Sequence, residues 1–143
     1  MTSRIWTEEE LKKASDSLEG KPAFDAIRWA VENFHPDMAL ACSFGSEDVA
    51  LVDMLAKIKS GARVFYIDTD LNFRETLDVR DALTEKYDIR LERVAPELSL
   101  SEMEGRHGKQ LWKTDADQCC NIRKVVPLVN KLSTLRAWIT GIR

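Results

Sequence analysis

Short apolar runs alternate along this chain with longer segments of helical spacing, and this alternation constrains the fold most strongly. The apolar runs lie at 38–42, 63–67, 89–94 and 137–140. Segments of helical period, 46–58 and 74–87, separate the first three runs. Strands that alternate with helices form parallel sheets with right-handed crossovers and helices on both faces. The sequence therefore predicts an α/β fold with a parallel sheet flanked by helices.

Two helices are expected ahead of the sheet. Thr7 and Glu10 have the spacing of a capping box, which begins a helix that continues to Leu18. Gly20-Lys21-Pro22 breaks that pattern, and a second apolar helix face follows over 24–34. No repeat, low-complexity tract or linker divides the 143 residues. We therefore expect one domain, with N-terminal helices at 1–35 and a sheet core at 38–143.

The stretch before the last strand has a weaker pattern. Gly105 and Gly108 interrupt residues 99–118, which predicts short helical pieces or a mobile loop there. Apolar residues return at helical spacing over 122–132, where Pro127 should kink the helix or begin a new one. The strand at 89–94 precedes Pro96 and is expected at an edge of the sheet.

The charge pattern argues against several classes of partner. The formal net charge is −3 without a block of like charges, so a general binder of nucleic acid or of anionic membranes is not expected. No apolar run approaches the roughly 20 residues that span a bilayer, and no signal-peptide core follows Met1. We expect a cytoplasmic protein in which local groups hold any anionic ligand.

The loop after the first predicted strand is a candidate anion site. Residues 43–48, SFGSED, combine small hydroxyl residues with a glycine, so an anion can approach the backbone at the start of the next helix. The alternative is an ordinary Ser/Gly turn, with Ser46 as the N-cap and acidic residues in the first helical turn. The sequence leaves both interpretations open.

Two further polar segments follow predicted strands. Asp68-Thr69-Asp70 could hydrogen-bond a ribose or a nucleobase, or form only a turn and a helix cap. In Thr140-Gly141-Ile142-Arg143, the glycine would let a base approach and Arg143 could hold an anion. The alternative for this second segment is a solvated chain end.

The adjacent pair Cys119-Cys120 favours metal or redox chemistry. A disulfide between neighbours needs a strained backbone, whereas two thiolates can bind a soft metal ion or two irons of one cluster. Arg123 and Lys124 follow within a turn, and cations beside thiolates lower their pKa and offset the charge of a cluster. The alternative is a buried pair of small side chains. Cys42 lies in an apolar run and is expected to be a buried hydrophobic residue.

Five segments, taken in order, resemble the assimilatory adenylyl-sulfate reductases. They are 42–48 (CSFGSED), 65–70 (FYIDTD), 111–114 (LWKT), 119–128 (CCNIRKVVPL) and 137–143 (AWITGIR). The resemblance implies a fold like that of the PP-loop adenine-nucleotide enzymes. Related phosphoadenylyl-sulfate reductases lack the iron–sulfur cluster, so the double cysteine points to the adenylyl-sulfate branch.

The resemblance also implies roles for individual residues in binding adenylyl sulfate. The loop would face the phosphate–sulfate end of the substrate, and a second group of residues would surround the adenosine. Lys124 would bridge the cluster and the sulfate. The loop residues are Ser43, Phe44 and Gly45, and the adenosine residues are Ile67, Thr69 and Gly141.

The implied reaction is the reduction of adenylyl sulfate to sulfite and AMP on the route to cysteine. Family members hold a [4Fe–4S] cluster with the adjacent cysteines and a later Cys-x-x-Cys, so Cys119 and Cys120 would be two of four ligands. A cysteine in a C-terminal Glu-Cys-Gly motif attacks the sulfur, and AMP leaves. Thioredoxin or a similar dithiol then releases sulfite from the S-sulfocysteine.

The chain departs from the family pattern at two points. It stops at Arg143 and contains neither the second cysteine pair nor the attacking cysteine, so we expect the N-terminal part of a longer enzyme that is inactive alone. Asp70 stands where many members of the wider family carry glycine.

Three alternatives remain, and homo-oligomerisation is also open. The first is phosphoadenylyl-sulfate reductase activity. The second is an ATP pyrophosphatase of the PP-loop class, against which Phe44 interrupts the small-residue loop that such an enzyme requires. The third is a truncated remnant that binds a nucleotide without catalysis.

Overall fold

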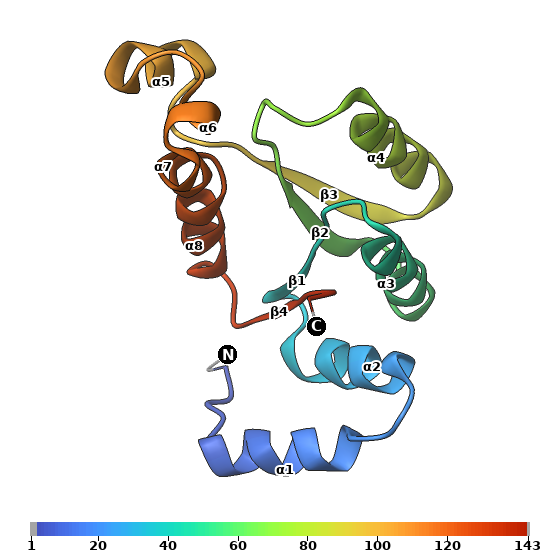
Figure 1. Cartoon of the computed structure of the whole chain (residues 1–143). Coiled ribbons are helices and arrows are strands. Elements are labelled where there is room, and N and C mark those ends of the chain that lie inside the picture. Colours follow the sequence, from blue (N-terminus) through green and yellow to red (C-terminus); the bar gives the residue numbers. More distant parts are fainter. Residues whose placement is uncertain (1–2, 143) are drawn as a thin grey trace.

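The computed structural model describes residues 3–142 and contains one parallel sheet of four strands. The strands pair in the order β3-β2-β1-β4, which places β3 at an edge as expected (Figure 1). All three pairings are parallel, so the predicted α/β sheet is confirmed. The strands are β1 (Met38–Ala41), β2 (Ala62–Ile67), β3 (Ile89–Val94) and β4 (Ala137–Ile139).

Helices flank the sheet on two sides. Figure 1 shows α3 and α4 beside one face and the continuous rod of α7, η1 and α8 beside the other. The element η1 is a single π-helical segment inside that rod. The helices are α1 (Glu8–Leu18), α2 (Ala23–Phe34), α3 (Ser46–Ile58), α4 (Arg74–Lys86), α5 (Leu100–His107), α6 (Leu111–Thr114), α7 (Ala116–Cys120), η1 (Asn121–Val125) and α8 (Val126–Leu132). No helix in residues 3–142 has the length and apolar character needed to cross a membrane.

The central strands are buried because both of their faces are covered. Leu40 of β1 is fully buried and lies in register with Val64 on one side and Ile139 on the other. This is the reason that the strand sequences are continuous apolar runs rather than alternating ones. The main core packs β1 and β2 against α2, α3 and α4 and contains Ile27, Leu40, Cys42, Val52, Leu55, Ala62, Val64 and Leu83.

An ionic cluster holds α8 against the face of the sheet opposite to α3 and α4. Glu92 of β3 accepts hydrogen bonds from Arg63 of β2 at 3.1 Å and from Lys131 of α8. Lys131 is itself mostly buried, with 12% of its side chain exposed. Phe65 lies below the Lys131 ammonium and fills the space between α8 and β2. One carboxylate therefore joins two strands and a helix.

The N-terminal helices follow the sequence closely. The Thr7–Glu10 capping box forms, with the Thr7 hydroxyl accepting from the Glu10 N–H and the Glu10 carboxylate accepting from the Thr7 N–H. No residue of α1 is buried, so its cap and its exposed ion pairs hold it more than packing does. The aromatic rings of Trp6, Trp29 and Phe34 attach the preceding segment to α2.

Three local expectations need correction or refinement. Gly45, rather than Ser46, is the N-cap of α3, and the Ser46 hydroxyl contacts Glu47 instead. Gly105 does not interrupt its helix, since α5 continues through it and ends at Gly108, whose φ of 90° is accessible to glycine. Pro127 lies in the first turn of α8, directly after the π-helical segment η1, so it marks the start of a new helical segment within the rod.

Leu40→Ala should lower the free energy of unfolding by about 2–5 kcal/mol, because it opens a cavity between three strands and two helices. Urea denaturation followed by circular dichroism measures the change. Val129→Ala on the exposed side of α8 is the control, and it should change stability by no more than about 0.5 kcal/mol. Equal losses in the two variants would contradict the assigned core.

Glu92→Gln should destabilise the chain at neutral pH and much less in acid. The hydrogen bonds from Lys131 and Arg63 outweigh the effect of burial and hold the pKa of Glu92 below its usual value of 4.5. A lowered carboxyl pKa contributes stability above that value, and the contribution disappears as the pH falls through the lowered pKa. The stability difference between wild type and variant, measured by urea denaturation, should therefore narrow below about pH 4.5. Glu85→Gln, at an exposed position of α4 without an ion pair in residues 3–142, should show no such trend.

Candidate functional site

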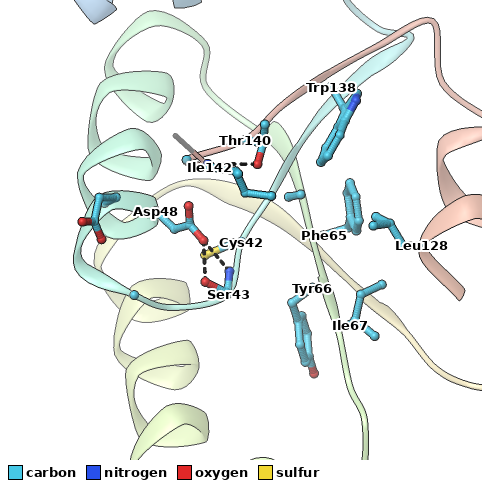
Figure 2. Close-up of a pocket in the computed structure, with 14 residues that line it drawn as sticks. Cys42, Ser43, Asp48, Phe65, Tyr66, Ile67, Leu128, Trp138, Thr140 and Ile142 are labelled. Atoms are coloured by element: carbon cyan, nitrogen blue, oxygen red, sulfur yellow. Dashed lines mark hydrogen bonds between the residues drawn. The ribbon is translucent and has the colours of Figure 1, made fainter. Parts of the chain in front are cut away.

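A cavity of about 270 Å³ lies at the carboxyl ends of β1, β2 and β4 (Figure 2). Ligands of open parallel sheets bind at this end of the strands. Four large side chains form an apolar wall, and the β1–α3 loop and the residues after β4 form a polar rim. The wall consists of Phe65, Ile67, Leu128 and Trp138, and the rim includes Ser43, Gly45, Asp48, Thr140 and Gly141.

Asp48 fixes the shape of the polar rim. Its buried carboxylate accepts hydrogen bonds from both the N–H and the hydroxyl of Ser43, each at 2.7 Å. Gly141 lies against the same carboxylate, since a Cβ added there would be 2.4 Å from Asp48 Oδ1. The start of α3, the β1–α3 loop and the segment after β4 are thus in direct contact at a point that admits no side chain on Gly141.

The first turn of α3 adds donors to this rim. Helix α3 begins at Gly45 without a side-chain cap, so the N–H groups of its first turn have no partner within the helix. Exposed N–H groups at a helix N-terminus attract phosphate and sulfate oxygens. The geometry therefore fits the anionic end of a ligand at the loop and its apolar part against the wall.

Phe44 belongs to the loop but does not line the cavity. Its φ of 65° is left-handed, which is uncommon for a large side chain. The ring packs edge-on against Tyr66, with 5.3 Å between centroids. The Tyr66 hydroxyl in turn accepts a hydrogen bond from Arg80 of α4 at 3.1 Å. Phe44 therefore supports the loop from behind.

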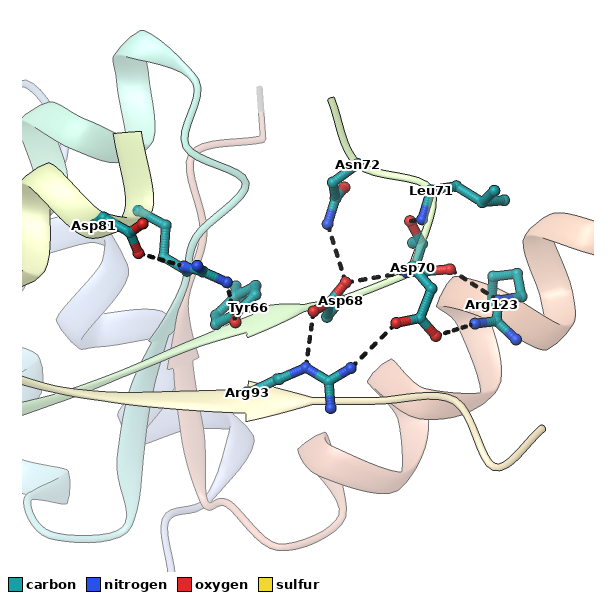
Figure 3. Close-up of polar contacts among 10 residues, drawn as sticks. Tyr66, Asp68, Asp70, Leu71, Asn72, Asp81, Arg93 and Arg123 are labelled. Carbon is teal, nitrogen blue, oxygen red and sulfur yellow. Dashed lines mark hydrogen bonds and ion pairs between the residues drawn. The ribbon is translucent and has the colours of Figure 1, made fainter. Parts of the chain in front are cut away.

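Two arginines hold the loop that follows β2 (Figure 3). Arg93 donates to Asp68 at 2.8 Å and to Asp70 at 3.2 Å. Arg123, only 1% exposed, donates to Asp70 at 2.6 Å and to the Thr69 carbonyl at 3.0 Å. Asp70 has a φ of 61°, a conformation that glycine adopts most readily, and its two ion pairs offset that strain.

The electrostatics of this loop follow from the same contacts. Burial opposes the charge of Asp68, but the hydrogen bonds from Arg93 and from the Asp70 N–H hold the pKa of Asp68 below its ordinary value. The paired carboxylate raises the pKa of Arg93. The acidic side chains of the Asp68-Thr69-Asp70 segment are therefore committed to the loop, which favours the turn interpretation for them. Thr69 is buried, and its hydroxyl accepts from the Leu71 N–H.

A second cavity, of about 320 Å³, contains the adjacent cysteines. Cys119 and Cys120 line it together with Thr69, Lys124 and Trp112. Cys119 is buried and Cys120 is exposed. Both thiols border one space, so the pair fits part of the ligand set of a metal centre. Residues 3–142 contain no group of three or more potential metal ligands, so the described part supplies at most these two to a cluster.

The cationic pair after the cysteines divides into two roles. Arg123 and Lys124 both line the cysteine cavity, as their position after the cysteines predicts, but the guanidinium of Arg123 is buried and paired with Asp70. Lys124 is exposed, lines the cysteine cavity and forms no ion pair within residues 3–142. A buried arginine saturates its donors on protein oxygens, whereas the neighbouring lysine keeps its charge available.

Cys42 matches its expected structural role. It is 5% exposed in the main core at the end of β1. Burial, together with the nearby charge of Asp48, raises the pKa of the Cys42 thiol to about 11. A thiol with that pKa is protonated at neutral pH and is a poor nucleophile.

The residues predicted for substrate binding are distributed over the two cavities. Ser43, Gly45, Ile67 and Gly141 line the cavity at the strand ends. Thr69 and Lys124 line the cysteine cavity, and Phe44 lies behind the loop. Arg143 is outside the described residues. Thr69 follows Ile67 by two positions, so the end of β2 connects the two cavities.

Several site residues were not predicted. The role of Asp48 in holding the loop was missed, although its position in the first turn of a helix after a Ser/Gly loop was a usable signal. Trp138 and Leu128 were expected in a strand and a helix, but not as walls of a site. No local sequence pattern indicated the role of Arg93, because its partners Asp70 and Asp68 lie 23 and 25 positions away along the chain.

Comparisons with known proteins agree with this geometry. Residues 37–143 match the family model "Phosphoadenosine phosphosulfate reductase domain". A protein of Bacillus pumilus, "Adenosine 5'-phosphosulfate reductase", is 42% identical over the whole chain. A protein of the same description from Geobacillus sp. is 38% identical over 100% of the chain. Another, from Staphylococcus epidermidis, is 41% identical over 87% of the chain. The chain spans 61% of the length of the Bacillus and Geobacillus proteins and 52% of the Staphylococcus protein.

A solved structure shares the fold. The phosphoadenylyl-sulfate reductase of Candida auris, crystallised as a phosphate complex, superposes with a TM-score of 0.80 at 24% identity. The superposition covers 99% of this chain and 71% of that one. The family model covers most of the chain, from just before β1 to its last residue. This chain therefore belongs to the phosphoadenosine phosphosulfate reductase domain family.

Proposed function

We propose that this chain is the nucleotide-binding part of an adenylyl-sulfate reductase, an enzyme that forms sulfite and AMP. The observation that carries the proposal is the cavity at the strand ends, which β2 connects to a cavity containing two adjacent cysteines. Relatives described as adenosine 5'-phosphosulfate reductases support this choice of substrate. The activity belongs to assimilatory sulfate reduction for cysteine synthesis in the cytoplasm.

The two parts of the substrate would contact different parts of the site. The adenosine would lie against the apolar wall of Ile67 and Trp138, near Gly141, where the absence of a side chain allows close approach. The phosphate–sulfate end would face Ser43, Gly45 and the N–H groups of α3. Phe44 would keep the loop in place through its contact with Tyr66.

Cys119 and Cys120 would hold a [4Fe–4S] cluster together with two ligands from a part of the protein beyond this chain. When bound, the cluster would supply a polar centre that keeps both cysteines as thiolates at the edge of the site. Lys124 would then lie between the thiolates and the sulfate and reduce the repulsion between them. Arg123 would position the cysteine-bearing helix through its bonds to the loop after β2.

The proposed reaction has two steps. A cysteine thiolate attacks the sulfuryl sulfur, the S–O bond to the phosphate breaks, and AMP leaves with the electron pair. One thiolate of a dithiol such as thioredoxin then attacks the cysteine sulfur and sulfite departs; the second thiol breaks the resulting mixed disulfide, which restores the enzyme cysteine and leaves the donor as a disulfide. Cys42 is unsuited to the first step because its pKa is about 11 and it is buried. The attacking thiol would therefore come from outside this chain.

Adenylyl sulfate should bind this chain in preference to ATP and to 3′-phosphoadenylyl sulfate. The substitution Gly141→Ala should weaken the binding of adenylyl sulfate about ten-fold, or about 1.4 kcal/mol. The new methyl group would displace the Asp48 carboxylate that fixes the Ser43 loop. Isothermal titration calorimetry measures the affinities.

The matched control for this test is Gly105→Ala. Gly105 is helical, has no heavy atom within 4 Å of an added Cβ, and lies outside the site. Its substitution should leave the affinity unchanged. Preferential binding of ATP with release of pyrophosphate would instead identify a PP-loop pyrophosphatase.

The isolated chain should release no sulfite from adenylyl sulfate in the presence of thioredoxin and its reductant. It lacks a suitable attacking thiol and a complete set of cluster ligands. A colorimetric sulfite assay under anaerobic conditions makes the measurement, with the Bacillus pumilus relative as the positive control. Steady release of sulfite by this chain would show that one of its own three cysteines is the nucleophile.

A further inference from the structure

A third cavity, of about 590 Å³, shares only Trp138 of the described residues with the candidate site. It is bounded by the segment Ser3–Trp6, by Trp29 and Phe34 of α2, and by the start of β4. Ala137 of β4 pairs with Met38 at the beginning of β1, whereas the candidate site follows the end of β1. The two cavities therefore open toward opposite ends of the sheet, and Figure 1 shows the N-terminal segment beyond the start of β4.

Aromatic rings form the walls of this cavity. Trp6 and Trp29 meet edge-on, with 5.5 Å between ring centroids, and Phe34 lies 5.7 Å from Trp6 and 5.6 Å from Trp29. Trp138 of β4, 38% exposed, faces the same space. The Arg4 guanidinium covers one face of Trp6 at 4.1 Å from the ring centroid, and the remaining ring faces and edges favour a flat apolar ligand.

The polar groups of the cavity are donors and cations. Arg136 lies over the Phe34 ring, donates to the Arg4 carbonyl, and has no carboxylate partner within residues 3–142. None of the described residues that line the cavity is acidic. The indole N–H of Trp6 is buried without an acceptor among the described residues. A buried donor without an acceptor is unfavourable, so an acceptor that reached it would stabilise the segment.

We propose that this cavity binds a small aromatic anion, with its ring among the tryptophans and its charged group on Arg136. A planar ring would pack against the aromatic walls, and a carboxylate or phosphate would accept charge-assisted hydrogen bonds from the Arg136 guanidinium. A small outward shift of the Ser3–Trp6 segment would let an acceptor reach the Trp6 N–H. The proposal is independent of the substrate assigned to the candidate site.

Trp138 would connect this site to the candidate nucleotide site. It lines both cavities, one on each side of its position in β4. A ligand that fixes this ring in one cavity therefore changes a wall of the other. Coupling between the two ligands would be reciprocal, because each must change the affinity of the other by the same factor.

The test follows the four tryptophan indole N–H signals of the ¹⁵N-labelled chain by NMR while indole-3-acetate is added. The Trp6 signal should shift saturably, and the signal of Trp112, which lies in the cysteine cavity, should not. Neutral indole-3-acetamide and non-aromatic cyclohexylacetate should each bind about ten-fold more weakly, because each lacks one of the two features recognised. Indole 3-phosphate, tested in parallel, distinguishes a preference for phosphate from one for carboxylate.

Arg136→Gln should weaken the binding of indole-3-acetate about ten-fold. Arg28→Gln is the matched control, since Arg28 also lies over an aromatic ring, that of Phe24, but does not line the cavity. An unshifted Trp6 signal, equal binding of the acid, the amide and the cyclohexyl compound, or an unchanged affinity in Arg136→Gln would overturn the proposal. If Arg136→Gln does not fold, the compounds compared on the unaltered chain decide the question.

Discussion

The arrangement of the whole site depends on the buried guanidinium of Arg123. It extends from the π-helical segment η1 across to the loop after β2, where it binds the Asp70 carboxylate and the Thr69 carbonyl. A third bond to the Leu98 carbonyl adds the segment that leads into α5. Because a buried cation without partners would be very costly, these bonds leave the cysteine-bearing rod one favourable position against the sheet. The distance between the two cavities of the site is fixed by the same side chain.

A second constraint fixes the β1–α3 loop at the carboxyl ends of β1 and β4. Asp48 holds the Ser43 loop, and Gly141 touches the same carboxylate from the segment after β4. The loop is therefore held by the first turn of the helix that follows it and by the segment after β4. Both donors of Ser43 are bonded to Asp48, so the donors that remain for an anion are the N–H groups in the first turn of α3.

The sequence was sufficient to predict the elements but not the contacts between distant loops. Periodicity located each strand and the longer helices, because a buried parallel sheet imposes continuous apolar runs and a helix imposes a 3.6-residue period. Cys42 was identified as buried from its run alone. The roles of Arg93 and Trp138 were not predictable in this way, because each depends on a neighbour brought close only by the topology of the sheet. Asp48 differs from them, because its partner Ser43 is only five positions away. Arg123 shows the limit most clearly, since its position beside Lys124 predicted a place near the cysteines but not its buried ion pair with Asp70, 53 positions away.

The charge balance at the site follows from these contacts. Arg93 and Arg123 face Asp68 and Asp70, so two cations and two anions cancel within one loop. Lys124 lines the cysteine cavity with no ion pair in residues 3–142, and the first turn of α3 has N–H groups without helical partners. A chain with a formal net charge of −3 can thus attract an anion only where its cations are not already paired. The phosphate–sulfate end of a nucleotide would satisfy both the lysine and the helix, whereas its adenosine needs only the apolar wall. Because Ile67 at the end of β2 lines one cavity and Thr69 lines the other, the two parts of such a ligand would meet at the end of β2.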